Sequence, residues 1–228
     1  MKFIKKINKM KKEIDLLKNY PKAKRDLGKR LEEKSEKDRL VARKFGKEFF
    51  DGSRSQGYGG FNYMPKFWQP VIPTFIEHWK LDQNKSILDV GCAKGFMLHD
   101  FKEAINGIKV KGIDISDYAI KNCIETVKDD VQVSDAKNLQ FEDNAFDIVI
   151  SINTVHNLDL DECIQAIKEI ERVAKQDSFI TVDAYRNKEE KERMNAWNLT
   201  AKTIMSVDEW KELFEEINYT GDYYWFIP

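Results

Sequence analysis

The run from Ser86 to Phe96 constrains the fold of this chain more than any other segment. An apolar strand ends at an acidic residue, small residues follow at Gly91, Ala93 and Gly95, and an apolar helix begins at Phe96. This order is how a parallel α/β sheet brings its backbone close to a nucleotide-like ligand. The run therefore predicts a ligand site at the carboxyl edge of such a sheet. The alternative is a glycine-rich turn between a strand and a helix that binds no ligand.

The spacing of the small residues also indicates which ligand is bound. A dinucleotide-binding turn needs a third glycine at position 96, where helix and strand pack closely, and phenylalanine stands there instead. No phosphate-binding Gly-Lys-Ser/Thr loop occurs in the sequence. Asp89 followed by Gly91, Ala93 and Gly95 resembles motif I of class I S-adenosylmethionine (SAM)-dependent methyltransferases. The resemblance implies that the turn passes beneath the methionine and ribose moieties of SAM.

Two further acidic residues follow predicted strands. Asp114 ends a strand predicted over residues 108–114, and a carboxylate there can accept hydrogen bonds from both ribose hydroxyls of an adenosine. Asp135 follows a strand near residues 131–134, and the methyltransferase resemblance implies that it binds the adenine amino group. The predicted cofactor site also includes Ile115, Ala136, Ser151 and Tyr63.

The resemblance extends over roughly residues 84–185. The loop and strand from Leu139 to Ile150 are similar to those of quinone-biosynthesis-type small-molecule methyltransferases. Strands are predicted at residues 86–90, 108–114, 131–134, 146–151 and 178–184, alternating with helices, which implies a parallel sheet. The fold implied is a doubly wound, mostly parallel, Rossmann-like α/β sheet, with S-adenosylhomocysteine as the product of the cofactor.

The chain divides into a predicted helical cap and lid, residues 1–83, and a catalytic domain, residues 84–228. An apolar helical stripe runs from Phe3 to Leu17 and is predicted to dock on the parent domain or on a second copy, which allows a homodimer. Glycines and aromatics between Asp51 and Tyr63 exclude regular structure and predict a lid. Further helices are predicted at residues 24–34, 37–49, 67–80 and 160–173.

The C-terminal region shows one clear helix start. Ser206 and Glu209 have the spacing of a capping box, which predicts a helix that runs to about Asn218. The tail, residues 219–228, is predicted to form a single last strand. The methyltransferase family usually ends in a pair of strands there.

Acceptor chemistry in this family usually follows the fourth strand, which here means residues 151–158. His156 is the candidate general base, because histidine titrates near neutral pH, and Asn153 is a candidate polar contact. The alternative is that His156 caps the next helix or fills a polar gap. The Asn/Asp-Pro-Pro-aromatic motif of base N-methylation is absent, which disfavours a nucleic-acid substrate.

Four further residues are candidates for binding the acceptor. Arg186 and Tyr185 follow the fifth strand, and Arg186 could clamp a phosphate or carboxylate or could equally be a surface charge. Arg54 and Tyr58 belong to the predicted lid.

Charge is distributed unevenly along the chain. The net charge is −1, yet residues 1–50 hold 18 lysines and arginines against 8 acidic residues, and the remainder hold 20 against 31. A basic arm on an acidic body could attract a phosphorylated substrate, nucleic acid or an anionic membrane, or could be a solvated helical face.

The three cysteines lack metal-ligand spacing, so reduced thiols, no metal and a cytoplasmic location are expected. No apolar run has the length of a membrane span.

These features together predict an O-methyltransferase of a small, polar, anionic metabolite, such as a phosphorylated or nucleotide-linked sugar. The lid and the aromatic tail also resemble those of bacterial methyltransferases associated with surface polysaccharides. An RNA methyltransferase that uses the basic arm is the alternative. A non-catalytic partner subunit is disfavoured, because Asp89, Asp114 and Asp135 are all present.

Overall fold

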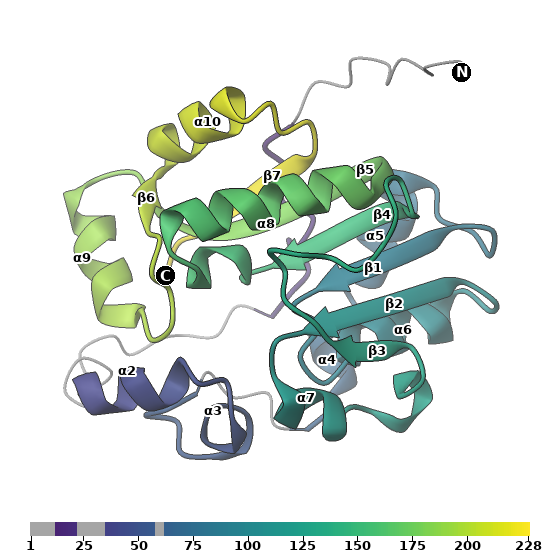
Figure 1. Cartoon of the computed structure of the whole chain (residues 1–228), viewed down its shortest axis with the longest axis horizontal. Coiled ribbons are helices and arrows are strands. Elements are labelled where there is room, and N and C mark those ends of the chain that lie inside the picture. Colours follow the sequence, from purple (N-terminus) through teal and green to yellow (C-terminus); the bar gives the residue numbers. More distant parts are fainter. Residues whose placement is uncertain (1–11, 22–34, 58–61) are drawn as a thin grey trace.

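The computed structural model describes residues 12–21, 35–57 and 62–228. Its centre is a seven-stranded sheet in the order β3-β2-β1-β4-β5-β6, with β7 also paired to β5 (Figure 1). The strands are β1 (Ser86–Val90), β2 (Lys109–Asp114), β3 (Val131–Val133), β4 (Phe146–Ile152), β5 (Ala174–Tyr185), β6 (Met205–Ser206) and β7 (Asp222–Phe226). The strand pairings among the described residues are parallel. The predicted doubly wound α/β sheet is therefore confirmed.

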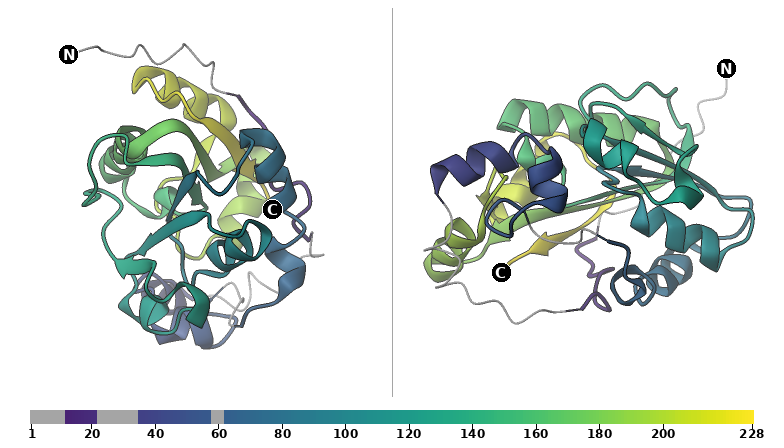
Figure 2. Two further views of the ribbon diagram at one scale, coloured as in Figure 1. Left: turned by 90° about the vertical axis from the view of Figure 1, so that its right-hand side faces the viewer. Right: turned by 90° about the horizontal axis from the view of Figure 1, so that it is seen from below.

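Helices cover both faces of the sheet. They are α2 (Glu36–Ala42), α3 (Lys47–Asp51), α4 (Pro65–Trp68), α5 (Ile72–Trp79), α6 (Phe96–Ala104), α7 (Asp117–Lys121), α8 (Leu160–Val173), α9 (Lys188–Trp197) and α10 (Val207–Glu216), with 3₁₀ turns η1 (Glu125–Val127) and η2 (Val155–Asn157). Helices α8 and α10 pack on one face, and α5 and α6 pack on the other (Figure 2). Side chains alternate along β1, so Ile87 belongs to the α5–α6 core and Leu88 to the α8–α10 core.

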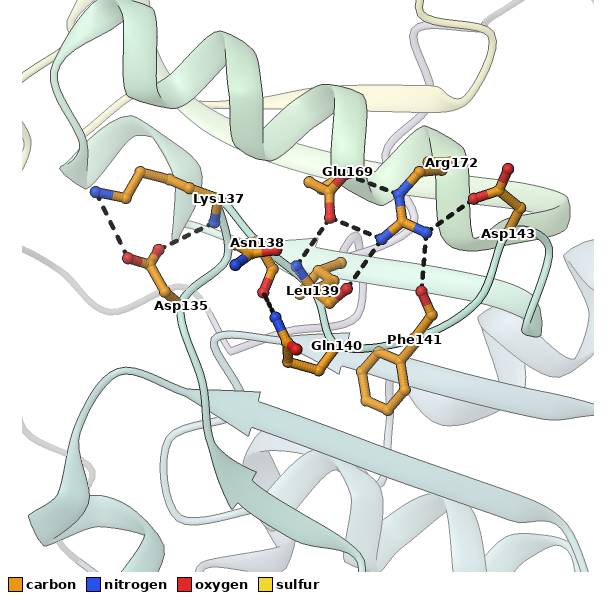
Figure 3. A network of polar contacts seen from close by, with 9 residues as sticks. All are labelled: Asp135, Lys137, Asn138, Leu139, Gln140, Phe141, Asp143, Glu169 and Arg172. Carbon is orange, nitrogen blue, oxygen red and sulfur yellow. Dashed lines mark hydrogen bonds and ion pairs between the residues drawn. The ribbon is translucent and has the colours of Figure 1, made fainter.

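The loop between β3 and β4 is held by Arg172 of α8. Its guanidinium forms two hydrogen bonds with Glu169, at 2.8 and 2.7 Å, and donates to the carbonyls of Leu139 and Phe141 and to Asp143 (Figure 3). Hydrogen bonding to Arg172 lowers the pKa of the Glu169 carboxyl. A planar five-donor group suits this task, because it can bind several acceptors in a fixed geometry. The loop that follows Asp135 is thus fixed to the body of the domain.

The first predicted helix is wrong over its described part. Residues 12–14 pair with β7 at the outer edge of the sheet, where Ile14 N donates to Tyr223 O and Tyr223 N donates to Lys12 O, each at 3.0 Å, and residues 16–20 form turns. Leu16 is 1% exposed within the α5–α6 core. The unpaired backbone of edge strand β7 and this apolar site override the helical periodicity. Because the described part of this segment packs on its own chain, it gives no support to a homodimer. Residues 3–11 of the stripe and the helix predicted at 24–34 lie outside the described residues.

Two other predicted helices are each divided in two. The helix predicted at residues 37–49 becomes α2 and α3, separated at Phe45, which has φ of +48°, and Gly46. The helix predicted at 67–80 becomes α4 and α5, separated around Pro70, which has no backbone N–H to donate.

The predicted division at residue 83 does not separate two cores. Phe75 of α5 stacks on Trp79, with ring centroids 5.2 Å apart, and contacts Phe101 and Phe179 of the catalytic domain. Residues 12–21 join the same core through Leu16. Residues 35–57 contain α2, α3 and the first part of the segment from Asp51 to Tyr63 that was predicted as a lid, and from this point the name lid refers to residues 35–57. Within the three described ranges, none of the helices combines the length and the apolar character that crossing a bilayer requires.

The C-terminal predictions agree with the structure. Ser206 and Glu209 form the capping box, with Ser206 N donating to the Glu209 carboxylate at 2.7 Å, and α10 ends at Glu216, slightly before the predicted Asn218. The tail supplies β7, which pairs with β5 over Phe179 to Asp183. The two-residue strand β6 pairs only with the last residues of β5.

Candidate functional site

The turn after β1 is left-handed at three positions. The φ angles are +89° at Gly91, +50° at Ala93 and +76° at Gly95. A Cβ on Gly91 would lie 2.1 Å from Oγ1 of Thr154, and one on Gly95 would lie 2.6 Å from a methyl group of Val127. Glycine is thus required at 91 and 95 both by the backbone angles and by close packing. The predicted motif I turn is formed.

Asp89 and Asp114 lie next to this turn on adjacent strands. The Asp114 carboxylate accepts hydrogen bonds from Ala93 N and Ser116 N, both at 2.8 Å, so it joins the tip of β2 to the turn. Burial raises the pKa of Asp114. Burial and the nearby Asp114 carboxylate raise the pKa of Asp89 to about 8. Two buried carboxyl groups that repel each other fit a positively charged ligand, because a cation compensates their charge. SAM carries such a charge on its sulfonium.

The next strand tip supplies Asp135, which is half-buried. Its carboxylate accepts from Lys137 N at 3.0 Å and lies 3.5 Å from Lys137 Nζ (Figure 3). Ile115 and Val133, at the ends of β2 and β3, are 56% and 47% exposed, although both are large apolar residues. Ala136 is half-buried beside Asp135. An adenine ring could cover such exposed apolar surface while Asp135 binds its amino group.

One end of the lid is fastened to the turn. Lys94, buried within the turn, forms an ion pair with Asp51 of α3 at 2.6 Å, and the Tyr118 hydroxyl donates to the same carboxylate at 2.7 Å. Burial by itself raises the pKa of Asp51, but hydrogen bonds from Lys94 and Tyr118 outweigh it and lower the pKa. Ser116 Oγ donates to Phe45 O at 2.5 Å. Helix α3 is therefore held against the ends of β1 and β2.

The other end of the lid reaches the far side of the sheet edge. Arg39 of α2 donates to Asn198 O, in the loop after α9, at 3.5 Å. In the same loop, Lys202 N and Thr203 N donate to His156 O, each at 3.0 Å. The lid thus extends from α7 to the α9 region across the carboxyl edge, as its position below α9 and beside α7 in Figure 1 shows.

The residues after β4 are placed differently from the prediction. His156 is 3% exposed, its Nδ1 accepts from Asp183 N at 3.0 Å, and its Nε2 lies 3.6 Å from the Asp183 carboxylate. Burial lowers the pKa of His156, so the ring is neutral with its proton on Nε2. Because the ring is buried and its Nδ1 already accepts a hydrogen bond inside the protein, this geometry does not favour His156 as a general base. It matches the alternative in which His156 fills a polar gap.

Asn153 and Ser151 also have defined partners. Asn153, with φ of +52°, is exposed at the sheet edge, and its side-chain oxygen accepts from Thr181 Oγ1 at 3.0 Å. Ser151 has no exposed surface, and its hydroxyl donates to Val90 O at 3.1 Å. Ser151 therefore stabilises the β1–β4 pairing and has no access to a ligand in this structure.

The predicted acceptor residues do not gather at one place. Tyr185, the last residue of β5, and Arg186 line a cavity of about 300 Å³ together with Glu13 and Lys211. Arg186 also lies 3.7 Å from Glu190, so it is not brought to the turn after β1. Arg54 is exposed on the lid, and Tyr58 lies outside the described residues.

Tyr63 lies beside α6. Its hydroxyl donates to Asp100 at 2.5 Å. Burial and the hydrogen bond to Asp100 raise its pKa to about 12. The hydroxyl of Tyr63, a residue of the predicted cofactor site, is therefore already hydrogen-bonded within the protein.

Several residues of the site were missed by sequence reasoning. Lys94 and Asp51 are 43 positions apart, and Asp51 carries no motif that marks it. Arg43 Nε and Asn157 Oδ1 are buried atoms without a hydrogen-bond partner in the described part of the chain. For the basic residues before Phe45, the sequence indicates only a net positive charge and singles out no residue.

A parallel sheet in the order β3-β2-β1-β4-β5, a left-handed turn after β1, and carboxylates at the ends of β1, β2 and β3 define the class I SAM-dependent methyltransferase fold. Residues 88–182 match the family described as a methyltransferase domain. Residues 88–182 of the chain therefore form a methyltransferase domain with the class I fold, and its cofactor is SAM.

Individual similar proteins agree in fold but differ in named activity. The chain is 34% identical over 92 residues to the arginine-hydroxylase NDUFAF5 of Mus musculus. This match covers 40% of this chain and 26% of that protein. The chain is 31% identical over 147 residues to a tRNA (carboxymethyluridine(34)-5-O)-methyltransferase of Arabidopsis thaliana, which covers 62% of this chain and 33% of that protein.

Among solved structures, a SAM-dependent methyltransferase from Archaeoglobus fulgidus aligns with a TM-score of 0.53 and 24% identity, covering 75% of this chain and 71% of that one. This likeness concerns the fold. The chain spans only about a quarter to a third of the length of the curated relatives described above.

Proposed function

We propose that the protein transfers the methyl group of SAM to an oxygen of a small, polar, anionic acceptor, such as a phosphorylated or nucleotide-linked sugar. The observation that carries this proposal is the lid, which is fastened at one end by Lys94 and Asp51 and contacts Asn198 at the other. A lid held across the sheet edge favours a small acceptor over a bulky one. It also excludes water and holds the reactants in line, which is where much of the rate of a methyl transfer originates.

The residues of the domain would bind SAM and the acceptor in the following way. SAM supplies an electrophilic methyl group when it is bound. Asp114 would accept hydrogen bonds from its ribose hydroxyls, and Asp135 would bind its adenine amino group. Asn153, exposed at the end of β4, would contact the acceptor. With His156 engaged inside the protein, an acceptor oxygen that is already ionised at neutral pH has the advantage that it needs no base.

The test is a reaction with SAM and a panel of sugar phosphates and nucleotide-linked sugars. We expect S-adenosylhomocysteine to form together with a product that gains the mass of one methyl group. The matching neutral sugars serve as controls and should react more slowly. Methyl transfer only to neutral acceptors, or none to any member of a broad panel, would contradict the proposal.

RNA is the second candidate acceptor. The Arabidopsis relative is named a tRNA methyltransferase, and residues 1–50 hold 18 basic against 8 acidic residues. Phosphate contacts by lysine and arginine make RNA binding strongly dependent on salt. Binding of bulk tRNA that weakens steeply between low and physiological salt, with methyl transfer to the tRNA, would favour this candidate.

A cytoplasmic location is proposed with either acceptor, because Cys92, Cys123 and Cys163 are free thiols.

A further inference from the structure

We propose that Arg43 of the lid binds the anionic group of the acceptor. This inference rests on the proposed function above, and it names the residue that would recognise the acceptor. Three observations support it: the direction of one side of α2, the position of Arg43 along the sheet edge, and an unpaired buried donor on its side chain.

One side of α2 is turned toward the catalytic domain. Ala42 has no exposed surface, and Arg39 Nε donates to Asn198 O of the domain. Arg43 follows Arg39 by four residues, so the two share this side of the helix. The opposite side carries Lys37, Leu40 and Lys44, all exposed. Arg43 is therefore directed to the domain and not to bulk solvent.

The position of Arg43 along the lid places it above the middle of the carboxyl edge. Before it, Arg39 contacts the loop that binds His156 O, just after β4. Two residues after it, Phe45 O accepts from Ser116 Oγ at the end of β2. In the sheet order, β1 lies between β2 and β4. The chain from Arg39 to Phe45 therefore crosses the region where the methyl group and its acceptor must meet.

The side chain of Arg43 carries a hydrogen bond that is not made. Its Nε is buried and has no acceptor among the described residues. Asn157 Oδ1, in η2 at the same sheet edge, is a buried acceptor that likewise lacks a donor there. Buried polar atoms are nearly always paired in folded proteins, so these two atoms at a ligand edge indicate a ligand whose anionic oxygen accepts from Arg43 Nε and whose hydroxyl donates to Asn157 Oδ1. A guanidinium binds a carboxylate or a phosphate through two parallel hydrogen bonds.

Such an anion could belong to the acceptor or to the methionine end of the cofactor. The acceptor is favoured as the source of the anion, because Arg43 lies on the side of α2 that contacts the loop beside η2. The acceptor site is expected there, at the residues that follow β4. The lid contact of the motif I turn is made instead by Lys94 and Asp51. The experiment below separates the two sources.

The protein is saturated with S-adenosylhomocysteine and titrated with inorganic phosphate, and separately with acetate, by calorimetry or NMR. We expect Arg43→Met to raise the dissociation constant for these anions about 10- to 100-fold, as expected for losing a charge-assisted pair, while the affinity for S-adenosylhomocysteine stays within about twofold. Lys44→Met removes the same charge from the exposed side of the next position and should change neither. Arg43→Lys should restore part of the anion binding.

Three results would overturn the inference. One is an Arg43→Met variant, folded by circular dichroism, that still binds phosphate like the wild-type protein. Another is a loss of S-adenosylhomocysteine affinity, which would place Arg43 at the cofactor carboxylate. The third is a wild-type complex that binds neither anion. Because no turnover is needed, Arg43-dependent anion binding without methylation of any anionic acceptor would contradict only the proposed function.

Discussion

Asp89 is buried at the end of β1, and its carboxyl group loses its proton at a higher pH than an ordinary aspartate does. Burial and the neighbouring Asp114 raise its pKa from 3.8 to about 8 in the folded protein. Because the folded pKa lies above the unfolded one, the folded state holds a proton that the unfolded state has lost between these two values. The free energy of unfolding must therefore decrease as pH rises through this window.

We expect Asp89→Asn to remove much of this pH dependence, since asparagine resembles the protonated form and does not titrate. Urea unfolding at several values between about pH 7 and pH 8.5 measures the effect, because the buried His156 contributes mainly below its ordinary pKa of 6.5. A variant with the same slope as the wild-type protein in this range would show that Asp89 does not titrate there.

Asp114 tests the cofactor site directly. Asp114→Ala removes the acceptor of the Ala93 and Ser116 amides together with the proposed ribose ligand. We expect SAM to bind about 10- to 100-fold more weakly by calorimetry, which corresponds to the loss of one charged hydrogen-bond acceptor. Asp117→Ala, which removes an exposed carboxylate three residues further on, is the control. Equal affinity in the Asp114 variant and the control would reject this role.

Which residues of the site could be predicted depends on the range of the contacts that place them. The acidic residues at 89, 114 and 135 could be read from the sequence, because each follows an apolar strand and a parallel sheet brings strand ends to one edge. His156 follows the fourth strand as predicted from the sequence, but its hydrogen bonding depends on Asp183 N, 27 positions away. Arg43 could not be recognised, because its importance depends on where the lid folds back onto the domain.

At the scale of elements, the ion pair between Lys94 and Asp51 fastens one end of the lid, and its loss should be measurable. Asp51→Asn removes the charge that faces Lys94, whose side chain is 7% exposed. Removing the negative charge that faces a buried lysine is costly, although the partial exposure of Asp51 reduces the effect. We expect SAM to bind about 5- to 30-fold more weakly, a loss of about 1–2 kcal/mol, and proteolysis within residues 35–57 to become faster. Glu48→Gln, an exposed acid in the same helix, is the control, and an Asp51 variant that behaves like it would show that the ion pair does not hold the lid.

The elements also show when local pattern is sufficient. The buried strands and α8 were predicted close to their observed bounds, because their own apolar periodicity matches the two cores that cover the sheet. The stripe that includes Ile14 and Leu17 has helical spacing as well. There the edge of β7 offers backbone partners that a helix could not use, so the chain pairs with it instead. Periodicity gives only the side-chain preference, and tertiary partners decide between the two backbone states.

At the scale of the whole molecule, residues 12–21 belong to the catalytic domain. Leu16 is 1% exposed in the core formed by α5, α6 and the sheet, and the segment around it extends the sheet beyond β7. We expect Leu16→Ala to lower the free energy of unfolding by about 2–5 kcal/mol, because it leaves a cavity in a packed core. Leu40→Ala makes the same chemical change on the lid at a position that is 61% exposed, and it should cost less than about 0.5 kcal/mol. Urea unfolding of both variants tests this prediction. If both lower the free energy of unfolding by the same small amount, residues 12–21 only rest on the surface of the domain.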